Sequence, residues 1–250
     1  MTKIIMLGCN GKMGQVIHEI VKEDAEAEIV AGVDIVDNRD NGYPVFSSIL
    51  DCTVSADVII DFSSVIGFED RLSYAKEKGI PIVLCTTGLS EAQIEEVKET
   101  SHSVAILKSA NMSLGINMLM KLVAEAAKIL AVEGFDVEIV EKHHNQKLDA
   151  PSGTALALAD AVNEAMDGQY EYVYDRSGVK QKREKKELGI SAVRGGSIVG
   201  EHDVIFAGKD EVVTFSHTAY SKAIFAKGAV AAAKFLKGKK AGMYDMSDVI

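Results

Sequence analysis

Short apolar segments alternate with segments of helical periodicity through about the first 110 residues, and this alternation limits the folds open to the chain. Short apolar runs bounded by turn residues predict strands, and apolar residues that recur every three or four positions predict helices. The predicted strands are Lys3–Leu7, Glu28–Val33, Val58–Phe62, Ile80–Cys85 and Val104–Leu107. The predicted helices are Met13–Lys22, Phe68–Lys78 and one that begins at the capping box Ser90-Glu91-Ala92-Gln93. This order predicts an α/β fold with a doubly wound parallel sheet over residues 1–112.

A different pattern begins near residue 113 and predicts a second domain. Helices are expected over Ile116–Val132 and Ser152–Met166. Phe135–Ile139 alternates apolar with acidic residues, so this strand has one face in water. Further strands are expected over Ser191–Arg194, Asp203–Ala207 and Val212–His217. We therefore expect an α+β domain with a mixed sheet over residues 113–221.

Two further segments complete the predicted organisation. Gly168–Lys186 contains a run of cations, Lys180, Lys182, Arg183, Lys185 and Lys186, and we interpret the segment as an exposed loop. The alanine-rich segment Ala223–Leu236 predicts a last helix, inside a carboxyl-terminal segment over residues 222–250.

Charge and composition narrow the partners and the location. The net charge of −10 argues against nucleic acid as a partner, because binding it requires an excess of positive charge. No apolar run approaches the roughly 18 residues that span a membrane. The first residues lack the long apolar stretch and cleavage site of a signal peptide, so a cytoplasmic protein without a membrane partner is expected. Cys9, Cys52 and Cys85 form no CxxC pair, and we interpret them as reduced, packed side chains.

A glycine-rich turn, Gly8-Cys9-Asn10-Gly11-Lys12-Met13-Gly14, joins the first predicted strand to the first predicted helix. Glycines in this position let the backbone approach a pyrophosphate, which the N–H groups of the helix then bind. The spacing is GxxGxxG rather than the usual GxGxxG, because Asn10 stands at the second glycine. The turn predicts a Rossmann-like dinucleotide site, and a tight strand–helix turn without a ligand is the alternative.

Three later features fall where such a site needs them. Asp34 ends the second predicted strand about 20 residues beyond the turn, where a carboxylate binds the adenosine ribose hydroxyls. The same charge repels the 2′-phosphate of NADP, and Ile35 cannot offset it. Cys85-Thr86-Thr87 and Ser109-Ala110-Asn111-Met112 follow two other strands, and we expect both to border the nicotinamide. A solvated strand end and simple loops are the alternatives.

Two histidines and a lysine, His143, His144 and Lys147, precede the turn Ser152-Gly153-Thr154. They predict a cationic site in an acidic protein. Ser152 is a plausible helix N-cap, and the N–H groups beside Gly153 can receive a substrate carboxylate. Histidine is a natural proton donor near neutral pH. A metal site is disfavoured, because adjacent strand residues point to opposite faces and no third ligand is spaced nearby. A purely structural histidine pair is the other alternative.

Here the sequence resembles a known family. The segment EKHHNQKLDAPSGTA over Glu141–Ala155 closely resembles the E-x-H-H-x-x-K-x-D-A-P-S-G-T-A signature of the dihydrodipicolinate reductase family, also called the 4-hydroxy-tetrahydrodipicolinate reductases. The resemblance covers nearly the whole chain and extends to further stretches: Gly8–Gly14, Thr86–Gly88, Ser109–Gly115, Arg194–Gly196, Gly200–His202, Phe225–Ala229 and Tyr244–Met246.

The resemblance implies a reaction and a set of site residues. It implies the NADH- or NADPH-dependent reduction of 4-hydroxy-tetrahydrodipicolinate, with loss of water, in diaminopimelate and lysine biosynthesis, by a homotetramer that assembles through the sheet of the second, substrate-binding domain. It also implies that the carboxyl-terminal segment over residues 222–250 returns to the dinucleotide-binding domain. It implies that His143 donates and accepts a proton and that Lys147 is a second proton donor. His144, Gly153 and Thr154 match substrate-binding positions, and to these we add the N-cap Ser152. The matched nucleotide-binding positions are Gly8, Cys9, Asn10, Gly11, Lys12, Met13, Asp34, Cys85, Thr86, Thr87, Ser109, Ala110, Asn111 and Met112.

Several positions depart from the family pattern. Asn10 and Cys85 stand where glycine is common, Met112 where an aromatic residue is frequent, and Ile35 where some members carry a cation for the NADP phosphate. These departures bear on cofactor preference, and none touches the HHxxK core. Another two-domain dehydrogenase and a nucleotide-sensing regulator are the rival functions, and neither explains the two histidines and the lysine beside an anion-binding turn.

Overall fold

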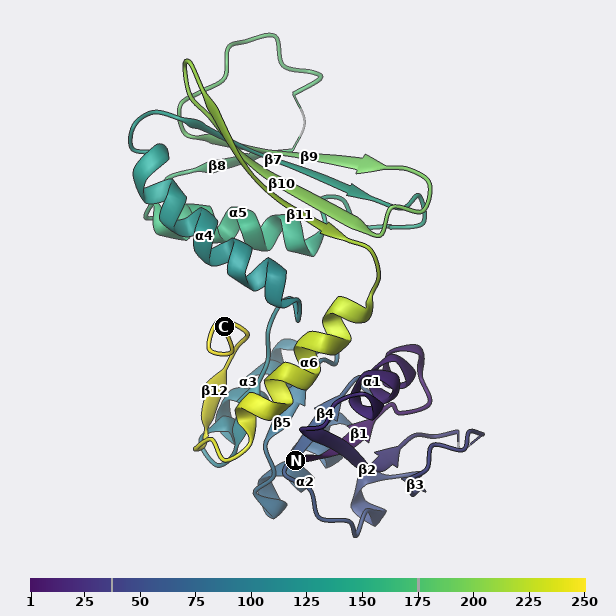
Figure 1. The fold of residues 1–250 in the computed structure, drawn as a ribbon. Coiled ribbons are helices and arrows are strands. Elements are labelled where there is room, and N and C mark those ends of the chain that lie inside the picture. Colours follow the sequence, from purple (N-terminus) through teal and green to yellow (C-terminus); the bar gives the residue numbers. More distant parts are fainter. Residues whose placement is uncertain (37, 175) are drawn as a thin grey trace. The chain divides into compact units, whose positions relative to one another are not determined.

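A computed structural model describes residues 1–36, 38–174 and 176–250 of the chain. Their contacts divide the chain into two compact units (Figure 1). The first unit contains Met1–Ser113 together with Ala223–Ile250, and the second contains Leu114–Lys222. The first unit is therefore assembled from two stretches of sequence, and the second from one.

The first unit is built on a seven-stranded sheet in the order β12-β6-β5-β4-β1-β2-β3. All its strand pairs are parallel, which confirms the predicted doubly wound sheet. The strands are β1 (Thr2–Leu7), β2 (Ala27–Val33), β3 (Val45–Phe46), β4 (Val58–Asp61), β5 (Ile82–Leu84), β6 (Ala105–Leu107) and β12 (Gly242–Tyr244). Its helices are α1 (Lys12–Lys22), α2 (Phe68–Lys78), α3 (Glu91–Ser101) and α6 (Ala223–Leu236), with a 3₁₀ turn η1 at Ile49–Asp51.

Alternation along the strands gives this sheet two apolar faces. Ile4 and Met6 of β1 pack in the core that contains α1 and α6, whereas Ile5 and Leu7 pack in the core that contains α2 and α3. A strand that is buried on both faces appears in the sequence as a continuous apolar run, which is how β1, β4 and β5 could be predicted. Cys9 and Cys52 are buried in these two cores, and Cys85 is partly buried.

The second unit is a five-stranded sheet in the order β11-β10-β7-β9-β8, with two helices on one face. The strands are β7 (Asp136–His143), β8 (Glu171–Val173), β9 (Glu187–Arg194), β10 (Gly200–Ala207) and β11 (Val212–Ala219), and the helices are α4 (Leu114–Leu130) and α5 (Gly153–Ala165). β9 runs parallel to β7 and β8, while β10 is antiparallel to β7 and β11. The predicted α+β unit with a mixed sheet is confirmed.

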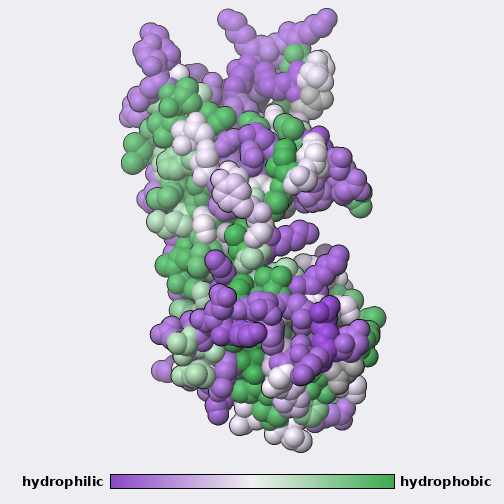
Figure 2. Space-filling model, turned by 45° about the vertical axis from the view of Figure 1, so that its right-hand side comes forward, coloured by the Kyte–Doolittle hydropathy of each residue, from purple (hydrophilic) through white to green (hydrophobic). Residues whose placement is uncertain are grey.

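The prediction of a simple exposed loop over Gly168–Lys186 was wrong in part. β8 lies inside this segment and pairs with β9. Arg183 is held against β7, because its guanidinium donates to Glu138 Oε1 at 2.8 Å and to Asp136 Oδ1 at 2.9 Å. Other side chains of the segment are exposed, and Figure 2 shows hydrophilic residues gathered at this end of the second unit.

None of the helices in the described parts of the chain combines the length and the apolar character that crossing a membrane requires.

Candidate active site

The glycine turn of the first unit brings three backbone segments into close contact. Gly8 follows β1 with φ +76°, and a Cβ there would lie 2.9 Å from the carbonyl oxygen of Phe62. A Cβ on Gly14 would lie 2.2 Å from the carbonyl oxygen of Gly8. Only glycine fits either place. α1 begins at Lys12 with Gly11 as its N-cap, and this glycine has no side chain to accept from the first N–H groups of the helix. Such an end is suited to an anion.

Asp34 ties the glycine turn to the end of β2. Its Oδ2 accepts from Asn10 N at 2.9 Å, and its Oδ1 accepts from Val36 N at 3.3 Å. The side chain of the next residue, Ile35, is 92% exposed and offers no positive charge. The carboxylate predicted to bind ribose therefore also shapes the turn that is predicted to bind pyrophosphate.

A cavity of about 530 Å³ lies beside this turn, within the first unit. Its lining includes Gly8, Asp34 and Ile35, and the loop after β4. Arg71 holds that loop, because its Nε donates to the fully buried Asp61 at 3.0 Å while its Nη1 donates to the carbonyl of Ile66 at 2.6 Å. The cavity, the glycine cradle and the free helix end fit the adenosine and pyrophosphate of a dinucleotide.

The other predicted nucleotide-binding turns follow β5 and β6, so they share one edge of the parallel sheet with the glycine turn. Thr86 Oγ1 is buried and has no hydrogen-bond partner among the described residues, and Thr87 and Ala110 are exposed. Cys9 and Met112 are buried in the core, so these two positions offer a ligand chiefly their backbones. Burial raises the pKa of the Cys85 thiol, and the nearby Asp61 carboxylate raises it further, which favours an uncharged side chain.

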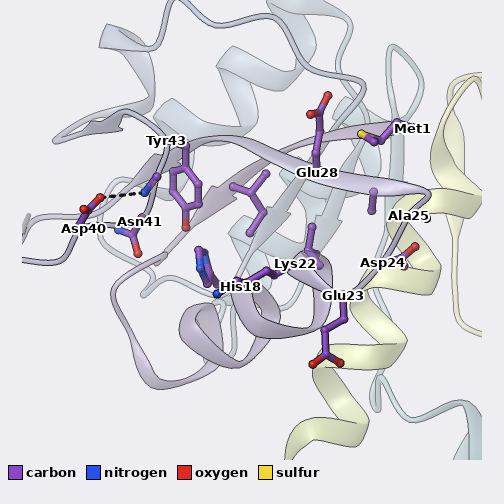
Figure 3. A pocket seen from close by; sticks show the side chains of 14 residues that line it. Met1, His18, Lys22, Glu23, Asp24, Ala25, Glu28, Asp40, Asn41 and Tyr43 are labelled. Carbon is purple, nitrogen blue, oxygen red and sulfur yellow. Dashed lines mark hydrogen bonds between the residues drawn. The ribbon is translucent and has the colours of Figure 1, made fainter.

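A larger cavity, about 820 Å³, lies elsewhere in the first unit, and its lining contains none of the predicted site residues (Figure 3). The rings of His18 and Tyr43 lie side by side in its wall, with centroids 5.7 Å apart. It adjoins Ala27–Ile29, where β2 begins, whereas ligands of open α/β sheets bind beyond the carboxyl ends of the strands.

The second unit brings the predicted catalytic segment together at the end of β7. Alternate residues of this strand are buried, so Glu141 and His143 share the face that the helices cover. Ser152 is the N-cap of α5, as predicted, and its Oγ accepts from Ala155 N at 3.2 Å. Gly153 and Thr154 form the first turn of α5. The N-terminus of α5 thus lies near the imidazole of His143, because Ser152 N donates to Glu141 at 3.0 Å and Glu141 contacts His143.

Lys147 and His144 lie in the loop between β7 and α5. The Nζ of Lys147 contacts both carboxylate oxygens of Asp149 at 2.8 and 2.9 Å. The hydrogen bond from Lys147 lowers the pKa of Asp149, which keeps that side chain ionised. His144 is partly exposed, and its carbonyl accepts from Lys147 N at 3.2 Å.

Sequence reasoning assigned no role to Glu141 or to three residues on other strands that complete this site. Arg194 forms a bidentate pair with Glu141, at 2.7 and 2.8 Å. His202 lies on β10 with its Nε2 3.1 Å from Ser152 Oγ and its ring 5.1 Å from that of His143. Burial, reinforced by His143, lowers the pKa of His202 to about 4, so its ring is neutral at neutral pH. His217 pairs with His202 across β10 and β11. Arg194 and His202 do belong to the family motifs noted in the sequence.

Within the described residues, no three His, Cys, Asp or Glu side chains are grouped so as to hold a metal ion.

Comparison with known proteins decides the family. A family model described as "Dihydrodipicolinate reductase, N-terminus" matches residues 2–112, and one described as "Dihydrodipicolinate reductase, C-terminus" matches residues 115–250. The chain belongs to the dihydrodipicolinate reductase family. Within this family, it is 52% identical to the 4-hydroxy-tetrahydrodipicolinate reductase of Caldanaerobacter subterraneus over 100% of its own length and 98% of that protein. It is 50% identical to the enzyme of the same name from Clostridium tetani, over 98% and 96% of the two chains.

A solved structure of a protein from another organism has the same fold as this chain. The dipicolinate-bound dihydrodipicolinate reductase from Paenisporosarcina sp. TG-14 aligns with a TM-score of 0.84 and 24% identity, over 100% of both chains.

Proposed function

We propose that this chain reduces 4-hydroxy-tetrahydrodipicolinate with NADH or NADPH and a proton, giving tetrahydrodipicolinate, the oxidised nucleotide and water, in the diaminopimelate route to lysine. The observation that carries the proposal is the buried His143–Glu141–Ser152 array at the start of α5, inside a family signature that this chain matches residue for residue. The reductase function is that of the family to which the chain belongs.

The first unit has the features that a nicotinamide dinucleotide needs. We assign the pyrophosphate to the Gly8–Met13 turn, the adenosine ribose to Asp34, and the nicotinamide end to the turns at Cys85–Thr87 and Ser109–Met112. A bound NADH or NADPH would supply the hydride that is delivered to ring carbon 4 once the hydroxyl has left. The turns orient the nucleotide, and the cavity beside Gly8 and Asp34 shields its adenosine half.

The second unit has the features that a small dicarboxylate needs. We assign one substrate carboxylate to the N–H groups of Gly153 and Thr154 in the first turn of α5, which Ser152 caps. We place His144 and Lys147 beside the rest of the charged substrate. His143 and Lys147 then exchange protons with the substrate. The dipicolinate bound by the Paenisporosarcina enzyme is a planar dicarboxylate of this kind, which supports the assignment.

The test is a coupled assay in which dihydrodipicolinate synthase makes the unstable substrate and nicotinamide oxidation is followed. We expect substrate-dependent oxidation by the wild type, and kcat lower by about 10²–10⁴-fold in His143→Gln and Lys147→Ala, with NADH affinity kept. His102→Gln and Lys98→Ala, at exposed positions of α3 and its carboxyl end, are matched controls. An absence of oxidation with either nucleotide would refute the proposal, and wild-type turnover in a catalytic variant would refute that residue's role.

We propose that NADH serves at least as well as NADPH. The carboxylate of Asp34 stands where the ribose is assigned, and Ile35 offers nothing to a 2′-phosphate. A charge-assisted hydrogen bond of about 1.5–3 kcal/mol corresponds to a preference of roughly 10- to 100-fold. Asp34→Asn should lower the ratio of kcat/KM for NADH over NADPH by that factor, while Asp40→Asn should leave it unchanged. A strong NADPH preference in the wild type would contradict the assignment and implicate Lys12 or Arg39.

We also propose that the chain forms a homotetramer in the cytoplasm. The face of the second sheet that lies opposite α4 and α5 carries Val140, Val193 and Ile205, each at least partly exposed, among charged residues. An association through this face would cover them. Light scattering at micromolar concentration should give a mass near four times 26.8 kDa, and a monomer mass would refute the proposal.

A further inference from the structure

We propose that Glu141 is the positioning residue of the reaction, which holds the proton on Nδ1 of His143 so that the proton exchanged with substrate is the one on Nε2. This inference rests on the proposed function, because it takes His143 to be the group that exchanges the proton.

The first support is the hydrogen bonding of Glu141, whose side chain is fully buried. Its Oε2 lies 2.6 Å from His143 Nδ1 and 2.8 Å from Arg194 Nη1. Its Oε1 lies 2.7 Å from Arg194 Nη2 and 3.0 Å from Ser152 N. Four donors from three elements converge on one carboxylate, so neither its position nor that of the His143 ring is free to vary.

The second support is the charge state of this carboxylate. Burial raises the pKa of Glu141, but hydrogen bonds from Arg194, His143 and Ser152 N outweigh burial and hold the pKa below its usual value. An ionised carboxylate only accepts hydrogen bonds, so Nδ1 of His143 must be the donor. The imidazole therefore keeps its Nδ1 proton in both charge states, and only Nε2 gains and loses a proton.

The third support is the space around Nε2. A Cβ on Gly200 of β10 would lie 3.1 Å from His143 Nε2, so the absence of a side chain there keeps that nitrogen uncrowded. Nδ1 is shut in by Glu141 while Nε2 faces this glycine. The geometry thus assigns the two nitrogens different tasks, as in other sites where a carboxylate orients a histidine.

Arg194 links this array to the lysine of the site. Besides binding Glu141, its Nη2 donates to the carbonyl of Asp149 at 2.7 Å, and Asp149 pairs with Lys147. Arg194 thus neutralises the buried carboxylate and fixes the loop that carries the second proposed proton donor. Among the described residues, the charged or titratable groups near His143 include Glu141 on its own strand, Arg194 on β9 and His202 on β10. His217 lies beyond His202, and Lys147 in the loop acts electrostatically on His202.

The experiment combines kinetics with a spectrum of the wild-type protein. In Glu141→Gln we expect kcat to fall about 10- to 100-fold, with KM for NADH within twofold of the wild type. We expect the kcat/KM profile against pH to differ from that of the wild type, because the protonated ring loses its anionic partner. Glu187→Gln is the matched control. This substitution also removes a buried carboxylate that pairs with an arginine, Arg176. Among the described contacts Glu187 has none with a histidine, so the pH profile should stay unchanged.

The spectrum decides the matter even if Glu141→Gln fails to fold. In ¹⁵N-histidine-labelled wild type, with His143 assigned by its loss in His143→Gln, the neutral ring should carry its proton on Nδ1. A neutral ring protonated on Nε2, or a folded Glu141→Gln with wild-type kcat and pH profile, would overturn the inference. If the wild type shows no substrate-dependent oxidation, the proposed function fails, and the tautomer still reports separately on Glu141.

Discussion

Acid should destabilise this protein through His202, and replacing that residue should remove much of the effect. Burial, aided by His143, lowers the pKa of His202 from 6.5 to about 4, with Glu141 acting in the opposite direction and His217 and Lys147 acting with His143. The unfolded chain therefore takes up a proton between these values and the folded chain does not. Stability is full above the unfolded pKa and falls as the pH drops towards 4. From pH 7 to pH 5 linkage gives a loss of about 2 kcal/mol from this residue alone.

The assay is urea unfolding of the wild type and of His202→Gln at both pH values and one protomer concentration. Glutamine keeps a polar group near Ser152 Oγ but cannot titrate. Between pH 7 and pH 5, the free energy of unfolding of His202→Gln should therefore fall by about 2 kcal/mol less than that of the wild type. His217, whose pKa burial also lowers, contributes to both proteins and cancels in the difference. The exposed His102→Gln should lose as much as the wild type. Equal losses in the wild type and His202→Gln would show that burial does not keep His202 neutral.

Three further predictions test the packing of the two sites. Gly14→Ala should destabilise the protein by about 1–3 kcal/mol and weaken NADH binding, because the added Cβ would lie 2.2 Å from the Gly8 oxygen and 2.6 Å from the Cys9 oxygen; urea unfolding and a fluorescence titration measure both, and a normal NADH affinity would contradict it. Thr154→Ala should raise KM for the substrate more than it lowers kcat, because an anchoring residue binds ground and transition states alike; an unchanged KM would remove Thr154 from the site. Gly200→Ala should lower kcat about tenfold without changing KM for NADH, because the methyl group would crowd His143 Nε2; wild-type turnover would show that Nε2 is not the reactive nitrogen.

The sequence predicted the larger elements of the fold well. α2 and α6 have the predicted bounds, and the capping box at Ser90 is present. α2 ends at Gly79 in the left-handed conformation that marked its end in the sequence. β3, β8 and β12 were missed, because two or three residues carry no periodicity and these strands exist through pairing with a neighbour. Val45 and Phe46, for example, form a strand only beside Gly32 and Val33.

The site could be predicted only where it is contiguous in sequence. His143, Lys147 and Ser152 lie within one segment, whereas Arg194 and His202 reach it through strand register, which pairs Arg194 with His143 and His202 with Glu141. This register could not be predicted from the sequence. The burial of Glu141 could have been predicted only from a longer strand. The predicted strand ends at Ile139, whereas β7 continues to His143, and its alternation places Glu141 and His143 on the covered face, opposite Glu138.

The return of α6 and β12 to the first unit has a consequence for how the chain is made. Both faces of the seven-stranded sheet must be covered, and Ala226, Ala229 and Leu236 of α6 belong to one of its cores. A Cβ on Gly228 would lie 1.6 Å from the Met112 oxygen, so α6 lies directly against the end of the first stretch. During synthesis residues 1–113 emerge before residues 223–250, so one face of their sheet stays uncovered until α6 and β12 have also left the ribosome. The second unit, which is continuous in sequence, is therefore the first part able to close its core, although it is translated later.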